Sequence, residues 1–277
     1  MTFRLFSLLL AFLLHSNLLA QNHWDQVLPE KKEGGTYHVF AENVNVRKDS
    51  NVQADILTKL QPGEKVKIVK KTKVIFTQGT SKEYWYQIQT NNQTGYIWGG
   101  LLADGFTQQE KFLILIRNNG VKSKKLELKV LKENKVISSL TFEPGPVSNE
   151  DWAFKSYKGS LFSPSPGILF GFRYLVFSEI EYAQPEETIF LIDAKGKLKT
   201  FYEWFPGGCD PPSCSETWLV FPGQVLTADP TIDRKEYKSP VNTILEITRS
   251  YDTDDVTINE YSITTKLWNG KTFLEPK

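Results

Sequence analysis

Histidine is scarce in this chain: there are three in 277 residues, and none between residues 39 and 277. A Ser-His-Asp or Cys-His site needs an imidazole to move the proton of the nucleophile, and zinc amidases need histidine among their metal ligands. These absences exclude His-dependent nucleophilic catalysis from residues 39–277. The sequence therefore predicts a protein that is not an enzyme and that uses no cofactor.

The chain also carries almost no net charge. Its 33 Lys and Arg residues nearly balance its 32 Asp and Glu residues, and removing residues 1–20 takes away one arginine, Arg4, and no acid. Binding to nucleic acid or to an acidic membrane surface favours a basic excess, so neither is predicted as a partner. Two local basic clusters, residues 65–73 and 122–125, are interpreted as solvated strand faces.

No apolar run is long enough to span a bilayer. Residues 5–14 are nearly all apolar, follow Arg4 and lead to a small-residue end at Ala20, the pattern of a secretory signal peptide rather than of a transmembrane helix of about 20 residues. We predict a signal peptide over residues 1–20 with cleavage near Ala20; an uncleaved anchor is the alternative. No cysteine follows this run, so no lipid anchor is expected, and the mature protein is placed in the periplasm or outside the cell with no membrane span.

Cysteine is limited to Cys209 and Cys214, in a segment rich in Pro and Gly. Such a segment can bend back and bring the sulfurs within bonding distance, and a disulfide is the expected outcome in an exported protein. Closing so short a loop pins it locally. A zinc site is the alternative, but it needs two further ligands and the mature chain offers only His23 and His38, both far upstream; no metal site is predicted.

Short alternating segments are abundant between residues 37 and 104. Residues 44–47 and 65–69 alternate apolar and polar side chains, which is typical of half-buried strands. Pro62 and Gly63 predict a tight turn before the second of these strands. Residues 84–89 and 95–98 indicate two more strands, joined by a short polar hairpin connection. Four or five strands in about 65 residues predict a compact barrel, near the lower size limit for a self-sufficient core.

The order of these pieces resembles the bacterial SH3-like domain family. The matching motifs are Val44-Asn45-Val46-Arg47, Leu60-Gln61-Pro62-Gly63, Trp85-Tyr86-Gln87-Ile88 and Gly95-Tyr96-Ile97. One segment departs from the family: residues 70–83 are longer and more polar than its usual link before the Trp, and an enlarged loop there is expected to widen or block a binding groove. The resemblance implies a small adaptor that binds cell-wall peptides or other ligands, rather than catalysis.

Aromatic residues on the last two strands of this region are candidate ligand-binding residues. Alternation puts Trp85 on the strand face opposite Tyr84 and Tyr86. We predict Tyr84, Tyr86 and Trp98 to face a groove, where they would stack on sugar rings or on the apolar part of a peptide. The alternative is a core role, which we assign to Trp85 and Tyr96.

The rest of the chain is also predicted to be β-rich, which makes the fold class all-β: a small barrel followed by a larger sandwich or curved sheet. Residues 21–36 form an N-terminal segment, residues 105–111 a linker, and residues 112–277 the second domain. Residues 112–116 are continuously apolar, as in a strand buried on both faces, and no stretch of ten or more residues keeps a helical period. The charged hairpins of this region resemble the C-terminal regions of uncharacterised exported bacterial proteins.

Carboxylates are the remaining candidates for chemistry. Glu179 and Glu181 could in principle cut a glycosidic bond, but on one strand face such a pair is typical of a solvated rim. Residues 252–255 could offer oxygen ligands to calcium, although acids and Thr are common at hairpin tips. We therefore expect an exported, non-enzymatic binding protein whose barrel docks on peptidoglycan, through a cell-wall peptide, or on an envelope protein. The alternatives are a carboxylate-based cell-wall glycoside hydrolase and a host-facing adhesin or toxin-like factor.

Overall fold

The computed structural model describes residues 31–90, 93–118, 125–144, 152–157, 159–177, 183–210, 212–227, 236–253 and 259–274. Within these ranges the protein is built of β-strands and short 3-10 turns, so the predicted all-β fold class is confirmed. No helix in the described ranges is long and apolar enough to cross a bilayer. The predicted signal peptide, residues 1–20, lies outside them.

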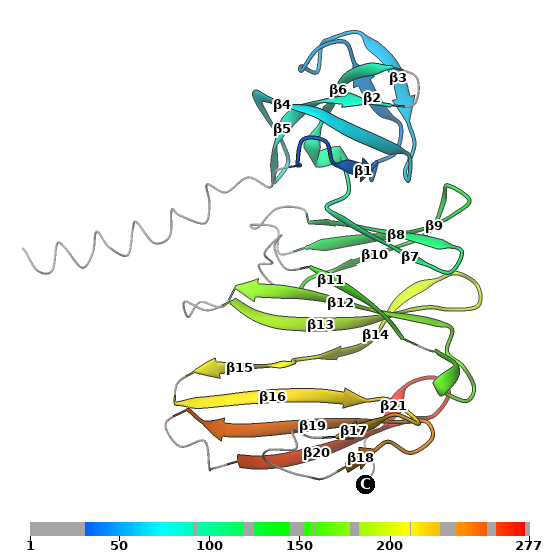
Figure 1. Ribbon diagram of the computed structural model, residues 1–277. Coiled ribbons are helices and arrows are strands. Elements are labelled where there is room, and N and C mark those ends of the chain that lie inside the picture. Colours follow the sequence, from blue (N-terminus) through cyan, green and yellow to red (C-terminus); the bar gives the residue numbers. More distant parts are fainter. Residues whose placement is uncertain are drawn as a thin grey trace, which may run out of the picture.

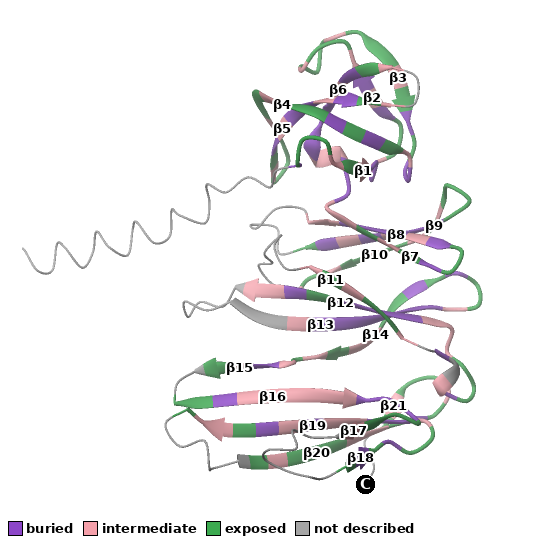
Figure 2. Ribbon diagram, in the orientation of Figure 1, coloured by how far each residue is buried: buried purple, intermediate pink, exposed green. Residues whose placement is uncertain are grey.

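The N-terminal unit is a barrel-like sheet in the strand order β1-β4-β5-β6-β2-β3 (Figure 1). Its strands are β1 (Thr36–His38), β2 (Val44–Arg47), β3 (Ile56–Leu60), β4 (Lys65–Gln78), β5 (Ser81–Gln89) and β6 (Thr94–Trp98). Along the start of β4, buried Val66 and Ile68 alternate with exposed Lys65 and Lys67, as the bands in Figure 2 show. The interpretation of this basic cluster as a solvated strand face is therefore confirmed for these two lysines.

The barrel begins before the residue at which the motifs placed its start. Lys31 is buried and forms an ion pair with Asp104, and its backbone N–H donates to the hydroxyl of Tyr86 at 2.9 Å. The backbone N–H of Gly34 donates to the carbonyl of Ile68 at 2.8 Å. The described part of the predicted N-terminal segment, residues 31–36, is thus packed on the barrel.

The prediction of an enlarged loop over residues 70–83 is wrong. The segment extends β4 and β5 into one long hairpin that turns at Gly79, whose φ is +61°. Alternation is weak in this lysine-rich stretch because its strands extend beyond the barrel core and much of their surface meets solvent. The hairpin still brings Phe76 against two aromatic rings of the barrel, Trp85 and Trp98.

The prediction of a linker over residues 105–111 is also wrong. β7 (Gly105–Gln109) pairs with β8 (Phe112–Asn118) and forms the edge of a sheet completed by β9 (Leu126–Lys132) and β10 (Lys135–Phe142), called here the upper sheet. The polar composition of β7 resembles that of a linker, but its buried Gln109 and half-exposed Phe106 show an edge strand with one side on the protein.

Two further sheets follow below the upper sheet (Figure 1). The middle sheet contains β11 (Ala153–Tyr157), β12 (Ile168–Phe177), β13 (Ala183–Ile192) and β14 (Leu198–Trp204). The lower sheet contains β15 (Gly207–Asp210), β16 (Ser213–Val220), β19 (Thr243–Asp252), β20 (Asn259–Trp268) and β21 (Phe273–Leu274). A two-stranded ribbon, β17 (Val225–Thr227) and β18 (Glu236–Lys238), packs on the lower sheet through Tyr237.

Successive side chains of the central strands enter different cores. In β13, Phe190 and Ile192 pack toward the upper sheet, whereas Ile189 and Leu191 pack toward the lower sheet. β8 divides in the same way: Ile114 and Ile116 contact the middle sheet, and Leu115 faces the barrel. The continuous apolar run at residues 112–116 is therefore a strand buried on both faces, as predicted.

The predicted disulfide is present. Cys209 and Cys214 form a directly paired position of β15 and β16, with Cα atoms 4.1 Å apart and their sulfurs bonded. Their strands lie at one edge of the lower sheet. The bond therefore closes an edge hairpin, in agreement with a local pinning role.

Candidate binding site beside the barrel edge

The predicted aromatic site does not exist as an exposed surface. Tyr86 has no exposed surface and Trp98 is 4% exposed, so the prediction that these two rings face a groove is wrong. Tyr84 is half-buried, and the ammonium of Lys71 lies 4.7 Å from the centre of its ring. Trp85, predicted to be core, is buried at 3% exposure.

The extended β4–β5 hairpin is the physical reason for the burial of Trp98, whereas Tyr86 belongs to the core of the barrel. The indole N–H of Trp98 donates to the carbonyl oxygens of Phe76 and Glu83, at 3.1 and 3.2 Å. The ring of Phe76 lies edge-on to Trp98 with 5.5 Å between centroids, and 6.4 Å from Trp85. Alternation along β5 and β6 could not reveal this, because the covering strand segment comes from the part of the sequence that resembled a loop.

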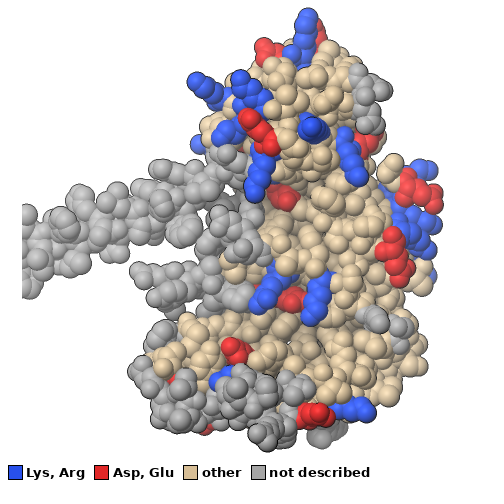
Figure 3. All heavy atoms as spheres, in the orientation of Figure 1, with Lys and Arg blue, Asp and Glu red and all other residues tan. Residues whose placement is uncertain are grey.

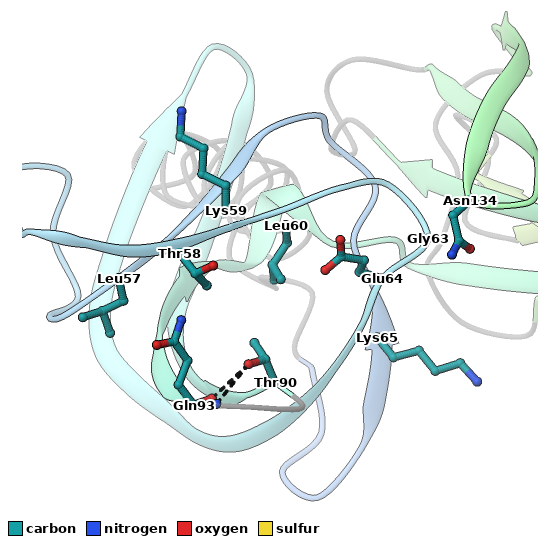
Figure 4. Close-up of a pocket in the computed structure, with 10 residues that line it drawn as sticks. All are labelled: Leu57, Thr58, Lys59, Leu60, Gly63, Glu64, Lys65, Thr90, Gln93 and Asn134. Carbon is teal, nitrogen blue, oxygen red and sulfur yellow. Dashed lines mark hydrogen bonds between the residues drawn. The ribbon is translucent and has the colours of Figure 1, made fainter.

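A groove of about 810 Å³ lies instead beside β3, the edge strand of the barrel. Figure 4 shows it between β3, the turn at Gly63 and the β5–β6 connection. Its lining residues are Leu57, Thr58, Lys59, Leu60, Gly63, Glu64, Lys65, Thr90, Gln93 and Asn134. The volume is within the range of about 300–1,000 Å³ that is typical of small-ligand sites.

The groove combines an apolar edge with a polar interior. Leu57 is 41% exposed, and Thr58, Gln93 and Thr90 line the opening that it borders (Figure 4). The Thr90 hydroxyl donates to the carbonyl of Gln93 at 3.2 Å, and this bond links the end of β5 to the start of β6. Apolar side chains beside fixed donors and acceptors suit an amide-rich, extended ligand.

Backbone turns hold the other wall of the groove. The backbone N–H of Gln61 donates to the carboxylate of Glu64 at 3.2 Å. Gly63 has φ of +87°, and a Cβ at this position would lie 2.8 Å from a methyl of Leu131 in β9. A side chain at residue 63 would therefore be strained and would collide with the upper sheet.

The charge around the groove is predominantly basic. Residues 31–104 contain eleven Lys and Arg residues and seven Asp and Glu residues, and Figure 3 shows the blue side chains spread over the barrel. Lys59 and Lys65 stand on the rim of the groove and point away from its interior (Figure 4). The resulting positive electrostatic potential favours ligands that carry negative charge.

A second hollow, of about 390 Å³, lies at the seam between the barrel and the upper sheet. His38 and Phe106 line it, with 4.6 Å between their ring centroids in an edge-on arrangement. The Nδ1–H of His38 donates to the carbonyl of Gly63 at 2.8 Å, since a carbonyl oxygen can only accept. Burial of the imidazole lowers the pKa of His38 from its usual value, and the positive charge of Lys65 adds to this effect.

Most of the carboxylate candidates cannot be placed within the described ranges. Glu179 and Glu181 lie outside the described residues, as do Asp254 and Asp255, whereas Asp252 ends β19 and is half-buried. Within the described ranges, no three His, Cys, Asp or Glu side chains are grouped as a metal site would require.

One part of the groove was visible in the sequence, although we did not assign it to a binding site. The Leu60-Gln61-Pro62-Gly63 turn was recognised as a turn, and it supplies two lining residues, Leu60 and Gly63. Asn134 was not visible in this way, because it belongs to the β9–β10 turn and only the packing of the two units brings it to the barrel.

Comparison with known protein families identifies the barrel. The family model of the bacterial SH3 domain matches residues 42–103, which confirms the resemblance drawn from the motifs. Domains of this family suggest a binding module and are often associated with cell walls. Neither the curated proteins nor the solved structures contain a match to the chain.

Proposed function

We propose that this protein is an exported, non-enzymatic binding protein whose barrel docks on a cell-wall peptide or on an extended segment of an envelope protein. The observation that carries the proposal is the groove beside β3, in which the edge strand of the barrel sheet, an exposed leucine and polar side chains lie together. An extended peptide satisfies both requirements of such a groove, because its backbone can pair with polar groups while alternate side chains reach apolar contacts.

Export and the absence of catalysis are parts of this proposal that rest on the sequence. The apolar run at residues 5–14 supports secretion, and the absence of histidine from residues 39–277 supports a binding role. The larger β-rich part, residues 112–277, would then present or receive a second partner.

Co-sedimentation with purified sacculi tests the proposal, with residues 21–277 as the test protein. Leu57→Glu should reduce the bound fraction about tenfold, since it places a carboxylate on the apolar edge of the groove. Val241→Glu is the matched control, because Val241 is 73% exposed and is not among the lining residues. The same supernatants are assayed for released sugar fragments.

Each outcome has a definite meaning. Binding that Leu57→Glu weakens and Val241→Glu does not supports the wall-docking groove. Release of soluble fragments contradicts the non-enzymatic role and favours the carboxylate-based hydrolase. If sacculi do not bind but a panel of extended peptides does, the partner is an envelope protein; if neither binds, the proposal is wrong.

A further inference from the structure

The groove beside β3 and the hollow at the seam share part of their lining. Both are lined by Gly63, Lys65 and Asn134. The first follows the edge strand β3, and the second ends against β7 and the β9–β10 turn. Figure 4 places Gly63 and Asn134 side by side at the end of the groove, and Lys65 points away from Leu57 there. A chain lying along β3 would therefore reach the seam at this end.

The β9–β10 turn that borders both hollows is shaped by two residues in an uncommon conformation. Glu133 and Asn134 have φ of +52° and +60°, which is the left-handed region that hairpin turns of this kind require. Asn tolerates this conformation well, whereas Glu does so at some cost. The turn is thus held in a fixed shape beside the barrel, with both residues lining the seam hollow.

The seam hollow differs in chemistry from the groove. Phe106 is 50% exposed and is supported edge-on by the buried ring of His38. Lys65 and Lys111 line the same hollow, and neither makes an ion pair with a carboxylate among the described residues. Glu133 is the acidic side chain of the hollow, so its lining carries an excess of one positive charge while His38 is neutral.

An apolar ring beside two unpaired ammonium groups suits a ligand group that combines an apolar body with one negative charge. The last residue of a peptide has this combination, since its α-carboxylate lies next to its side chain. We infer that the seam hollow receives the C-terminal residue of the bound peptide, with its side chain against Phe106 and its α-carboxylate facing Lys65 and Lys111. This inference rests on the proposed function, because it requires a peptide in the groove beside β3.

The other residues that line the seam hollow further restrict which peptide C-termini can bind there. Gln108 and Asn134 can hydrogen-bond the last peptide group. Glu133 repels a second negative charge, so a C-terminal residue with an acidic side chain should be rejected. The expected ligand is therefore a peptide with a free C-terminus and an apolar last residue.

The experiment uses residues 21–277 and a random heptapeptide library with free C-termini. The best selected peptide is synthesised as the free acid and as the C-terminal amide, and both are titrated calorimetrically. We expect the amide to bind about tenfold more weakly, because it lacks the charge that the two lysines face.

Two pairs of variants test whether the lysine and the phenylalanine of the seam hollow cause the preference for the free acid and for an apolar last residue. Lys111→Gln should reduce the difference between acid and amide while leaving amide binding unchanged, and Lys195→Gln, on an exposed turn of the middle sheet, should change neither. Phe106→Ala should weaken peptides with an apolar last residue about tenfold, and Phe205→Ala, which is 37% exposed elsewhere, should not. Thermal unfolding of each variant shows that the fold is retained.

The outcomes separate this inference from the proposed function. Equal binding of acid and amide, or an acid preference that Lys111→Gln leaves intact, overturns the C-terminal assignment while the groove beside β3 still binds peptide. A selection that enriches no peptide at all, together with failure to bind sacculi, overturns the proposed function and this inference with it.

Discussion

Trp98 was a candidate binding residue in the sequence and is a core residue in the structure. Its ring is 4% exposed and its N–H has two carbonyl acceptors from the β4–β5 hairpin. Tyr86 is satisfied in a similar way, since its hydroxyl accepts the backbone N–H of Lys31. Polar atoms on buried aromatic rings usually have such partners, so the presence of an N–H or O–H did not indicate exposure here.

Replacement of Trp98 should therefore affect stability first. We expect Trp98→Ala to lower the free energy of unfolding by about 3–5 kcal/mol, because it removes a large buried ring. Trp98→Phe keeps a ring but loses the N–H, and should cost about 1–2 kcal/mol. Urea unfolding measures both values. An Ala variant of unchanged stability that loses ligand binding would restore the exposed-site interpretation.

His38 should give stability a pH dependence. Burial lowers its pKa in the folded protein below the usual 6.5, so the unfolded chain binds more protons once the pH falls below that value. The contribution of the neutral imidazole is complete above about pH 6.5 and is lost as the pH falls through the lowered value. Urea unfolding between about pH 7 and pH 5 should show a smaller fall in stability for His38→Asn than for the unchanged protein. Parallel curves would contradict this assignment.

At the scale of elements, the central strands pack against a hydrophobic core on each of their two faces. β12 places Phe170 and Phe172 toward the upper sheet and Leu169 toward the lower sheet. Figure 2 shows the neighbouring strand β13 with a continuous run of buried colour in the middle of the stack. β15 instead lies at the edge of its sheet, and the disulfide joins it to β16.

Loss of the disulfide should have a local effect. Because Cys209 and Cys214 close a very short loop, the double variant Cys209→Ser/Cys214→Ser should lose about 2 kcal/mol or less. Amide hydrogen exchange should become faster in β15 and stay unchanged in β12 and β13. Exchange that accelerates across the middle sheet would show instead that the bond supports the whole stack.

For the whole molecule, the seam around Phe40 joins the barrel to the sheets. Phe40 has no exposed surface and packs with Leu115 and Leu131 of the upper sheet. The guanidinium of Arg117 and the ammonium of Lys129 lie 4.5 and 4.9 Å from its ring centre. The Lys129 ammonium also donates to the carbonyl of Phe40 at 3.1 Å. The barrel is thus docked on the upper sheet and is not an adaptor on a free linker.

Phe40→Ala should loosen this seam. We expect a loss of about 3–5 kcal/mol in the free energy of unfolding and faster proteolytic cleavage near residues 103–106. Phe205→Ala, at a 37% exposed phenylalanine away from the seam, should change stability by less than about 1 kcal/mol. Asp104 also bonds the upper sheet, because its backbone N–H donates to the carbonyl of Ile116 at 2.9 Å and its carboxylate accepts the backbone N–H of Asn118 at 2.8 Å. Unchanged proteolysis of the Phe40 variant would mean that these bonds and that of Lys129 hold the two units together without the ring.

The sequence predicted the structure best where the structure depends on residues that are close together along the chain. Alternation placed β2, the first part of β4, β5 and β6, the turn at Gly63 was recognised, and the spacing of Cys209 and Cys214 indicated their bond. It was misleading for residues 70–83 and 105–111, because polar edge strands and extended hairpins have the composition of loops. The groove was missed because its residues come from separate turns that no local pattern links.

The sequence by itself determined the all-β class, the family of the barrel and the position of most strands of the barrel, since period-two burial and turn chemistry act over a few residues. Only the tertiary structure decided which strand faces remain open. It covered Trp98 with the β4–β5 hairpin and left Phe106 half exposed at the seam. It also brought Asn134 to the groove. Exposure depends on what packs against a face, and that partner can lie anywhere along the chain.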